Sequence, residues 1–226
     1  MKTVLAFDFG ASTGRAIKAV FDGQEIKYEE IHRFENIPKE VDGHICHDVD
    51  MIIGEVKTAI DKAGEIDSIA FDTWGVDYAL LDEQGRIIHE PFHYRDERTK
   101  DALEKAFSLM SAEEIYAETG NQIMNINTLF QLISDDNKDK ADKLLFMPDL
   151  FSYLLTGKKV CETTIASTSQ MLNPLSKQWS EKVTDIFGIK KELFSEICPS
   201  ATVNGEYKQS EILLAGRHGR CCRFDE

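Results

Sequence analysis

The chain has 226 residues, of which 42% are hydrophobic and 29% are charged, a balance typical of a globular protein with one sizeable core. The formal net charge of −14 argues against a nucleic-acid-binding or anionic-membrane surface. A phosphorylated ligand would have to be held locally, by backbone N–H groups and a metal ion. No apolar run approaches the ~20 residues that span a bilayer, and the N-terminus does not resemble a signal peptide. We therefore expect a cytoplasmic protein.

The cysteine pattern also favours a reducing compartment. The chain has five cysteines: Cys46, Cys161, Cys198, Cys221 and Cys222. Their number is odd and none forms a C-x-x-C pair, which indicates unpaired thiols. His44, Cys46 and His47 lie close together, but with no fourth ligand nearby an ordinary structural role is favoured over a zinc site.

The first part of the chain predicts a sheet with one helix. Predicted strands cover residues 3–9, 15–21, 25–34, 66–71 and 78–81. Asp22-Gly23 predicts a two-residue hairpin turn. Asp48 or Asp50 can begin a helix whose apolar residues follow the 3.6 period up to Gly64. Residues 82–85 form a further turn, so strand 78–81 is expected to open a hairpin. Mixed strands with a helical crossover favour an α/β fold.

The second part is predicted to be mainly helical, and we expect an all-helical insert or face at about residues 98–140. Predicted helices cover 102–110, a segment opened by a capping box at 111–114, 128–133, a segment beginning at Pro148 and ending at Gly157, and a segment from Ser180 to near Gly188. Residues 144–147 predict a buried strand, and 162–170 a loop or short edge element. With no repeat or low-complexity linker, one domain is the economical interpretation.

The turn between the first two strands can form a phosphate site. Its residues are Asp8, Phe9, Gly10, Ala11, Ser12, Thr13, Gly14 and Arg15. The two glycines permit close backbone approach and positive φ, and the two hydroxyls can donate to phosphate oxygens. The arginine can pair with a phosphate or an acid, and Asp8 can hold Mg²⁺ through water. An ordinary turn explains the same residues, and neither the P-loop nor the Rossmann glycine pattern is present.

Two later stretches suit a sugar. In residues 71–78, Asp72 and Asp77 flank Trp74 and Gly75 at a strand end, where ligands of open α/β sheets bind. Carboxylates accept hydroxyl hydrogen bonds and an indole covers an apolar C–H face. The alternative is a structural turn with a core tryptophan. In residues 93–99, either Arg95 or Asp96 can reach the same site, unless this is only a solvated charge run.

These stretches carry a resemblance to a known family. The matching motifs lie at residues 7–15, 30–34, 67–78, 94–99, 127–132 and 147–157. Together they resemble the FGGY family of carbohydrate kinases, and within it the kinases of L-rhamnulose, from the N-terminus to about residue 180. The Asp-Thr-Trp-Gly-Val-Asp block at 72–77 is the most specific motif. The opening hairpin is shared with the wider actin and hexokinase superfamily.

The resemblance implies a ribonuclease H-like α/β fold, a mixed sheet with helices on both faces, duplicated in two domains with the active site between them. It implies transfer of the γ-phosphoryl group of ATP to the 1-hydroxyl of L-rhamnulose. The ATP contacts would come from Ala11, Ser12, Thr13, Gly14 and Arg15, with Asp8 placing the Mg²⁺. Gly75 would contact the sugar, and Asp72, Trp74, Asp77 and Arg95 are further candidates for the sugar pocket.

We do not find, in this sequence, the catalytic base that the resemblance implies. Family members are about twice as long, and their base is an aspartate that should fall near Gly219. Residues 215–226 instead form an aberrant tail after an N-terminal domain at 1–214. Codons for this tail, read one base later, can restore an aspartate in a family-type motif, so our hypothesis is a frameshifted end. We then expect little kinase activity from the chain alone, and an exposed apolar face where a second domain would pack.

Two alternatives remain open. The first is a kinase of another ketose, such as L-fuculose or L-xylulose. The second is an actin-like nucleotide-binding protein without sugar chemistry, against which the 72–77 block argues. No partner beyond sugar and nucleotide is expected, and the sequence does not set the oligomeric state.

Overall fold

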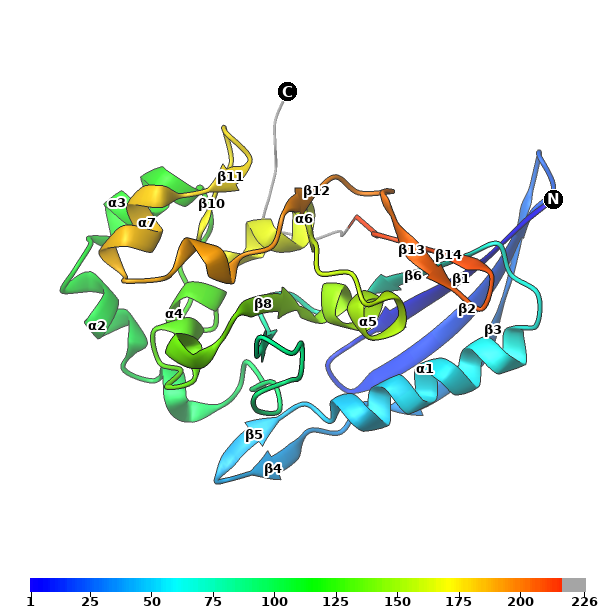
Figure 1. Ribbon diagram of the computed structural model, residues 1–226, viewed down its shortest axis with the longest axis horizontal. Helices are drawn as coiled ribbons and strands as arrows, with labels where there is room; N and C mark the ends of the chain where they lie inside the picture. The colour runs from blue at the N-terminus through cyan, green and yellow to red at the C-terminus, as the bar shows by residue number, and fades with distance from the viewer. Residues whose placement is uncertain (217–226) are drawn as a thin grey trace.

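A six-stranded mixed sheet forms one end of the molecule in the computed structural model, which describes residues 1–216 (Figure 1). Its strands are β1 (Lys2–Phe9), β2 (Thr13–Phe21), β3 (Ile26–Glu35), β6 (Ser68–Asp72), β13 (Val203–Tyr207) and β14 (Ser210–Leu213). They are arranged in the order β13-β14-β6-β1-β2-β3. β1 pairs antiparallel with β2 and parallel with β6, and β14 also runs parallel with β6. The predicted mixed α/β sheet is confirmed, but the β13–β14 hairpin was not predicted.

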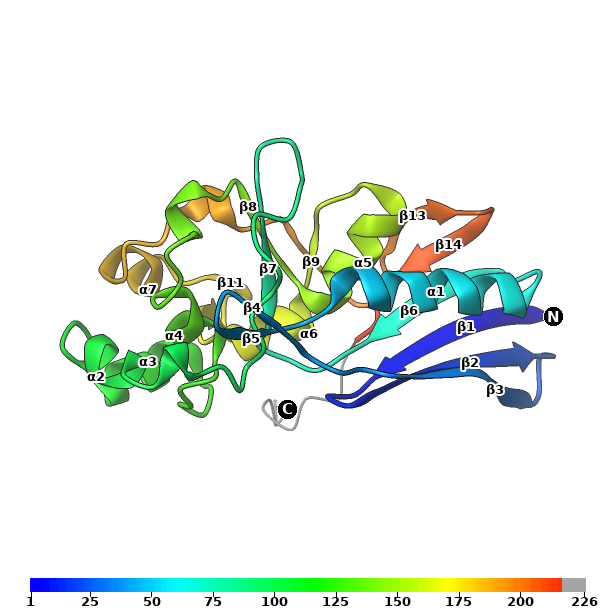
Figure 2. The same cartoon turned by 90° about the horizontal axis from the view of Figure 1, so that it is seen from below.

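Helices α1 (Val49–Ala63) and α5 (Met147–Thr156) pack on the core side of this sheet. Alternation along β1 directs Leu5, Phe7 and Phe9 into that core, while the residues between them are half-buried. The Phe9 ring lies 5.4 Å from the ring of Phe151 in α5, and α1 runs along β1 in Figure 2. Both helices belong to the core on the Leu5–Phe9 side of the sheet.

Local signals placed the helix ends well. Asp48 begins α1 by accepting a hydrogen bond from the Met51 N–H at 3.1 Å, and Gly64 ends it with φ of 69°. The predicted turn at Asp22 is longer than two residues. The Asp22 carboxylate accepts from the N–H groups of both Gln24 and Glu25, which stabilises a four-residue loop between β2 and β3.

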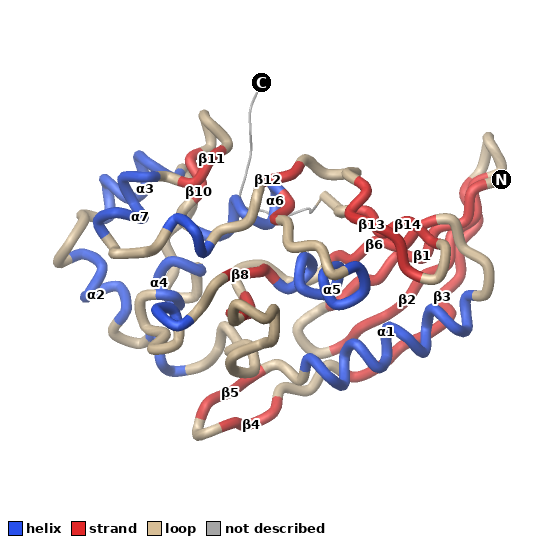
Figure 3. The backbone as a smooth tube through the Cα atoms, in the orientation of Figure 1, coloured by secondary structure: helices blue, strands red, loops and turns tan. Residues whose placement is uncertain are grey.

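The opposite end of the molecule is mainly helical (Figure 3). Its helices are α2 (Ala102–Phe107), α3 (Ala112–Thr119), α4 (Thr128–Leu132), α6 (Thr163–Ala166) and α7 (Glu181–Ile186), with 3₁₀ turns η1 (Glu97–Thr99), η2 (Lys138–Lys140), η3 (Ser167–Ser169) and η4 (Lys191–Leu193). The capping box of Ser111 and Glu114 is confirmed, as is the cap at Ser180. Residues 163–169 are helical rather than a loop, because the Glu162 carboxylate accepts from the N–H groups of Thr164 and Ile165.

Four two-stranded ribbons complete the fold: β4 (Lys39–Val41) with β5 (His44–Cys46), β7 (Tyr78–Leu81) with β8 (Lys143–Phe146), β9 (Cys161–Glu162) with β12 (Ile197–Cys198), and β10 (Leu172–Asn173) with β11 (Gln178–Trp179). The predicted turn at 82–85 brings the chain back to Leu81 as an antiparallel bridge with Ile87, but the full strand partner of β7 is the distant β8. Tyr78 and Leu80 pack into the helical core, whereas Ala79 and Leu81 pack into the sheet core. The ribbon therefore joins the two cores, which explains why all four residues of β7 are buried.

No helix within residues 1–216 is both long enough and apolar enough to cross a membrane. The predicted tail beyond Gly216, including Cys221, Cys222 and the expected base position near Gly219, lies outside the described residues.

Candidate functional site

The opening hairpin places a carboxylate and a guanidinium side by side. Asp8 and Arg15 are directly opposite each other in the β1–β2 ladder, and the Arg15 Nε lies 2.8 Å from Asp8 Oδ2. Both side chains are nearly half exposed, at 43% for Asp8 and 45% for Arg15. Such an exposed pair contributes only about 0–1 kcal/mol to stability. Arg15 can therefore exchange Asp8 for a phosphate at little cost.

Asn36 fixes the backbone of the hairpin turn. The Gly10 N–H donates to the Thr13 carbonyl at 2.8 Å, and the Asn36 side chain donates to the Gly10 carbonyl at 2.9 Å. The Asn36 N–H donates to the Ser12 carbonyl at 2.9 Å. Asn36 is buried while Ser12 and Thr13 are exposed. Buried Asn36 thus holds the backbone of the turn by hydrogen bonds, and the hydroxyl residues Ser12 and Thr13 are exposed to solvent.

We predicted positive φ and close backbone approach for the two glycines of the turn; positive φ is wrong, and close approach to a ligand stays a prediction. Among the described residues, neither Gly10 nor Gly14 has positive φ, so conformational freedom does not explain them. A Cβ on Gly14 would lie 2.2 Å from Cζ of Phe34, whose ring covers this point of β2. A Cβ on Gly10 would meet nothing closer than the Thr13 carbonyl oxygen, at 3.5 Å. Gly14 therefore makes room for the core, and only Gly10 leaves open space.

The parallel register brings the two predicted stretches together. Asp8 and Asp72 are partners at the last positions of the β1–β6 ladder, where both strands end. The candidate phosphate turn, which follows Asp8, and the candidate sugar turn, which follows Asp72, therefore begin side by side at the end of the sheet where ligands of such folds bind. Within residues 1–216, no group of three or more His, Cys, Asp or Glu side chains could hold a metal by itself.

Asp77 is a buried residue of the turn between β6 and β7. Its side chain is 0% exposed, and its Oδ2 accepts from the indole Nε1 of Trp74 at 3.0 Å and from the Tyr94 N–H at 3.2 Å. The same oxygen contacts His47 Nε2 at 2.7 Å, and Oδ1 accepts from the Gln131 amide at 2.8 Å. We predicted Asp77 as a sugar contact. The structure corrects this, because both oxygens are occupied by protein donors and none of the side chain reaches the surface.

Trp74 and Gly75 remain at the surface of the site, where both are partly exposed. The Trp74 ring stacks on the His47 imidazole with centroids 4.5 Å apart, while its N–H is bound by Asp77. The orientation of the indole is thus set by two buried groups. Asp72 is exposed at the end of β6.

Arg95 is carried to the same region by its backbone. The neighbouring Tyr94 N–H is bound to Asp77, and the Arg95 N–H donates to His93 Nδ1 at 3.0 Å. The Arg95 residue is exposed, with its guanidinium carbon 5.4 Å from the Tyr94 ring centre. Asp96 is buried and accepts from the Ile45 and Arg98 N–H groups. The prediction that Asp96 could reach the ligand is therefore wrong.

A buried histidine pair was missed by the sequence analysis. His47 and His93 are each 1% exposed, with rings 4.7 Å apart. Burial, followed by the proximity of His47, lowers the pKa of His93 to about 4. His47 packs against Trp74 and Asp77, and His93 packs behind it against His47 and Tyr94. The neighbouring His44-Cys46-His47 pattern was the sequence sign, and the ordinary structural role that we favoured for it over a zinc site agrees with the burial of His47.

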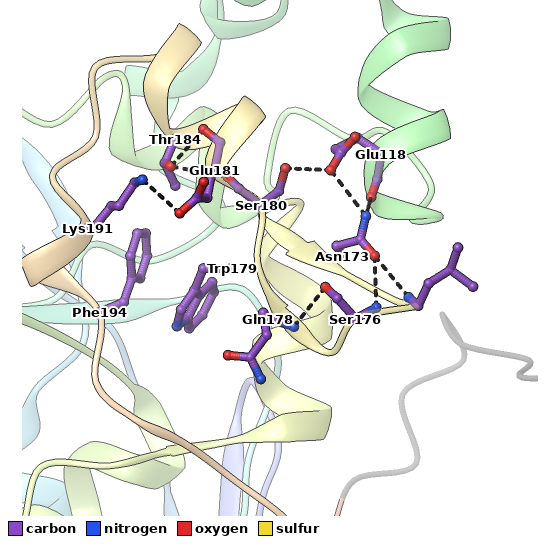
Figure 4. A pocket seen from close by; sticks show the side chains of 11 residues that line it. Glu118, Asn173, Ser176, Gln178, Trp179, Ser180, Glu181, Thr184, Lys191 and Phe194 are labelled. Atoms are coloured by element: carbon purple, nitrogen blue, oxygen red, sulfur yellow. Dashed lines mark hydrogen bonds and ion pairs between the residues drawn. The ribbon is translucent and has the colours of Figure 1, made fainter.

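A hollow of about 580 Å³ lies elsewhere, between α3, the β10–β11 ribbon and α7 (Figure 4). Its charged groups have partners within the hollow: Ser180 Oγ donates to Glu118 at 2.8 Å, and Lys191 Nζ lies 2.9 Å from Glu181. Trp179 is stacked on Phe194 with ring centres 4.3 Å apart. None of the predicted site residues lines this hollow.

Known proteins resemble this chain in both sequence and fold. Residues 3–219 match the FGGY family of carbohydrate kinases, N-terminal domain. The chain is 38% identical to a rhamnulokinase of Oceanobacillus iheyensis over 213 residues, covering 90% of this chain and 45% of that protein. It is 42% identical to a rhamnulokinase of Bacteroides thetaiotaomicron over 198 residues, covering 84% and 41%. The chain thus spans about half the length of these relatives.

Solved structures share the fold. A ligand-bound xylulose kinase from Lactobacillus acidophilus superposes with a TM-score of 0.84 at 20% identity, covering 96% of this chain and 48% of that one. A Plasmodium falciparum glycerol kinase with ADP superposes with a TM-score of 0.75 at 16% identity, with the same coverage. At these identities the likeness concerns the fold alone.

Proposed function

This chain belongs to the FGGY family of carbohydrate kinases, and we propose that it supplies the sugar-binding half of a kinase that transfers the γ-phosphoryl group of ATP to the 1-hydroxyl of L-rhamnulose. Two observations support the choice of sugar: the Asp-Thr-Trp-Gly-Val-Asp block at 72–77 and relatives named rhamnulokinase at 38–42% identity. The chain's own contribution is to bind and orient both substrates.

The observation that carries the proposal is the register of Asp8 with Asp72. It puts the candidate phosphate turn and the candidate sugar turn at adjacent strand ends, as transfer between two bound substrates requires. Asp8 would hold Mg²⁺, which neutralises charge on the phosphates when bound. Arg15 would leave Asp8 and pair with a phosphate oxygen. The backbone of residues 11–14 would face the nucleotide.

On the sugar side, Gly75 would contact the ketose through its backbone, and Trp74 offers an indole edge that Asp77 and His47 hold in place. Asp72 would accept a sugar hydroxyl, and Arg95 would donate to one. An acid–base group is needed to take the proton of the attacking hydroxyl. None of these residues is assigned that role.

Direct binding tests the proposal without depending on catalysis. The chain has two tryptophans, so Trp179→Phe leaves Trp74 as the single reporter, and Trp74→Phe is the matched control. We expect L-rhamnulose to change the fluorescence of the Trp179→Phe protein and to give a calorimetric binding signal, with no fluorescence change in Trp74→Phe. Tighter binding of L-fuculose or L-xylulose would reassign the substrate. A chain that binds nucleotide but none of these ketoses would refute the sugar-kinase proposal.

A further inference from the structure

The backbone at Val76 is strained. Its φ is 67°, a value that a β-branched residue rarely adopts. The Asp77 N–H donates to the Gly75 carbonyl at 2.9 Å, so residues 75–77 form a γ-turn with the unfavourable sign of φ at its centre. Such strain persists only where the surroundings over-determine it, and it concentrates at functional sites. The turn lies between Trp74 and Asp77, inside the candidate sugar site.

Two distant elements hold both peptide groups of Val76. Its N–H donates to Thr168 Oγ1 of η3 at 3.2 Å. Its carbonyl accepts from Thr128 Oγ1 at 2.8 Å and from the Gln131 amide at 3.3 Å, both in α4. Thr168 is 9% exposed, and the two α4 residues are 0% exposed. These partners are therefore shielded from water and are part of the support, not of the ligand surface.

The direction of the Thr168 hydroxyl is also fixed. Its single hydrogen goes to the Ile165 carbonyl at 2.8 Å, so its oxygen is left to accept from Val76. The methyl group of Thr168 packs under Gly75, where a Cβ would lie 3.3 Å from it. Thr168 thus sets the level of Gly75 and the direction of the Val76 N–H together.

Gln131 couples the turn to Asp77. Its amide nitrogen donates to Asp77 Oδ1 and to the Ile126 carbonyl, both at 2.8 Å, and shares a longer contact of 3.3 Å with the Val76 carbonyl, while its oxygen accepts from Arg98 at 2.7 Å. The Trp74 indole is bound to the other Asp77 oxygen. One buried side chain therefore links the strained turn and the tryptophan beside it.

We propose that Thr168, Thr128 and Gln131 are positioning residues that hold the Gly75–Val76 turn in its strained form, and that this form sets the affinity of the site for its ketose. The inference rests on the proposed function for the identity of the ligand, but the holding of the turn is a property of the chain alone. None of the three residues is assigned a contact with the sugar. Loosening the turn should therefore weaken sugar binding and leave nucleotide binding unchanged.

The test compares Thr168→Val, which removes the accepting hydroxyl, with Thr168→Ser, which keeps it. Hydrogen exchange of the Val76 amide and the Kd for L-rhamnulose and for Mg²⁺–ADP are measured on each. We expect Thr168→Val to speed Val76 exchange and raise the L-rhamnulose Kd by about 3- to 10-fold, the loss of one hydrogen bond, with the Mg²⁺–ADP Kd unchanged. Thr168→Ser should restore exchange to near the wild-type rate.

Two further variants keep the test decisive. Thr184→Val makes the same change at a threonine that is 1% exposed and hydrogen-bonded in α7, remote from the turn, and should alter neither measurement. Thr128→Val removes the bond to the Val76 carbonyl and replaces Thr168→Val if that protein does not fold. A wild-type chain that binds L-rhamnulose, with variants that bind it equally well, overturns the inference and leaves the proposed function standing. Fast exchange in Thr168→Val with no ketose bound by the wild type refutes the function but supports the holding of the turn. Unchanged exchange in both variants overturns the inference outright.

Discussion

Gly14→Ala separates packing from phosphate binding as the reason for this glycine. The new Cβ would lie 2.2 Å from Cζ of Phe34 and within 2.7 Å of its two Cε atoms, so the ring must move. Phe34 is 9% exposed and contacts the Phe9 ring edge-on at 5.5 Å, which leaves it little space. Overpacking of a tight core costs about 1–3 kcal/mol. Replacing glycine by alanine also stabilises the fold by about 0.4–1 kcal/mol, because it lowers the conformational entropy of the unfolded chain.

We therefore expect the free energy of unfolding to fall by about 1–2 kcal/mol, the difference between these two terms. For a chain of this size the melting temperature should drop by about 2–4 °C per kcal/mol. The measurement is thermal and urea unfolding without ligand. Gly10→Ala is the matched control in the same turn, because its Cβ meets only the Thr13 carbonyl at 3.5 Å. It should be neutral or slightly stabilising.

The same glycine substitution in a Phe34→Leu protein tests whether the Phe34 ring causes the destabilisation. Phe34→Leu removes the Cε and Cζ atoms that clash, so Gly14→Ala should cost almost nothing in that background. The double-mutant cycle should then give a coupling energy of about 1 kcal/mol or more. The packing explanation is refuted if Gly14→Ala unfolds like the wild type and loses only nucleotide affinity. It is equally refuted if the destabilisation persists in full in the Phe34→Leu background.

Three further outcomes follow from the site. The pKa of His93 is about 4 in the folded chain, below the ordinary value of 6.5, so the unfolded chain takes up the proton first as the pH falls. The contribution of His93 to the free energy of unfolding should therefore be complete above pH 6.5 and decline towards pH 4. The decline amounts to at most about 3 kcal/mol. Urea unfolding should show that the stability of His93→Gln depends less on pH than that of the wild type, and an equal dependence on pH would contradict this. Asp77→Asn leaves buried donors unmatched, so the free energy of unfolding should fall by about 3 kcal/mol or more and Trp74 emission should shift to the red. A stable protein with unchanged emission would show that Asp77 does not hold the indole. Asp8→Asn breaks an exposed pair with Arg15 and should change stability by less than about 1 kcal/mol, while calorimetry should show weaker binding of Mg²⁺–ADP; equal affinity would remove Asp8 from the proposed metal site.

The sequence by itself determined most of the local structure. Short apolar runs predicted strands such as β1 and β6, alternation predicted β3, and the 3.6 period predicted α1. Asp48, Ser111 and Ser180 begin helices as expected, because a cap is a hydrogen bond between residues two or three apart. Such signals are complete within a few residues. The resemblance carried by short motifs likewise pointed to the family that the comparison of residues 3–219 shows.

The tertiary structure alone decided what the site residues do. Asp77 looked like a ligand in a polar turn, but donors from residues 47, 94 and 131 converge on it and bury it. Gly14 was expected to have positive φ, which it does not; the ring of Phe34, twenty positions later, leaves no room for a Cβ there.

Nothing in the local sequence indicates positive φ at Val76, because a β-branched residue disfavours it. Only the bonds from Thr128, Gln131 and Thr168 make that conformation tenable. These contacts join parts of the chain that are 52 to 92 residues apart. Their existence therefore depends on the fold as a whole, and no local pattern of residues can reveal them.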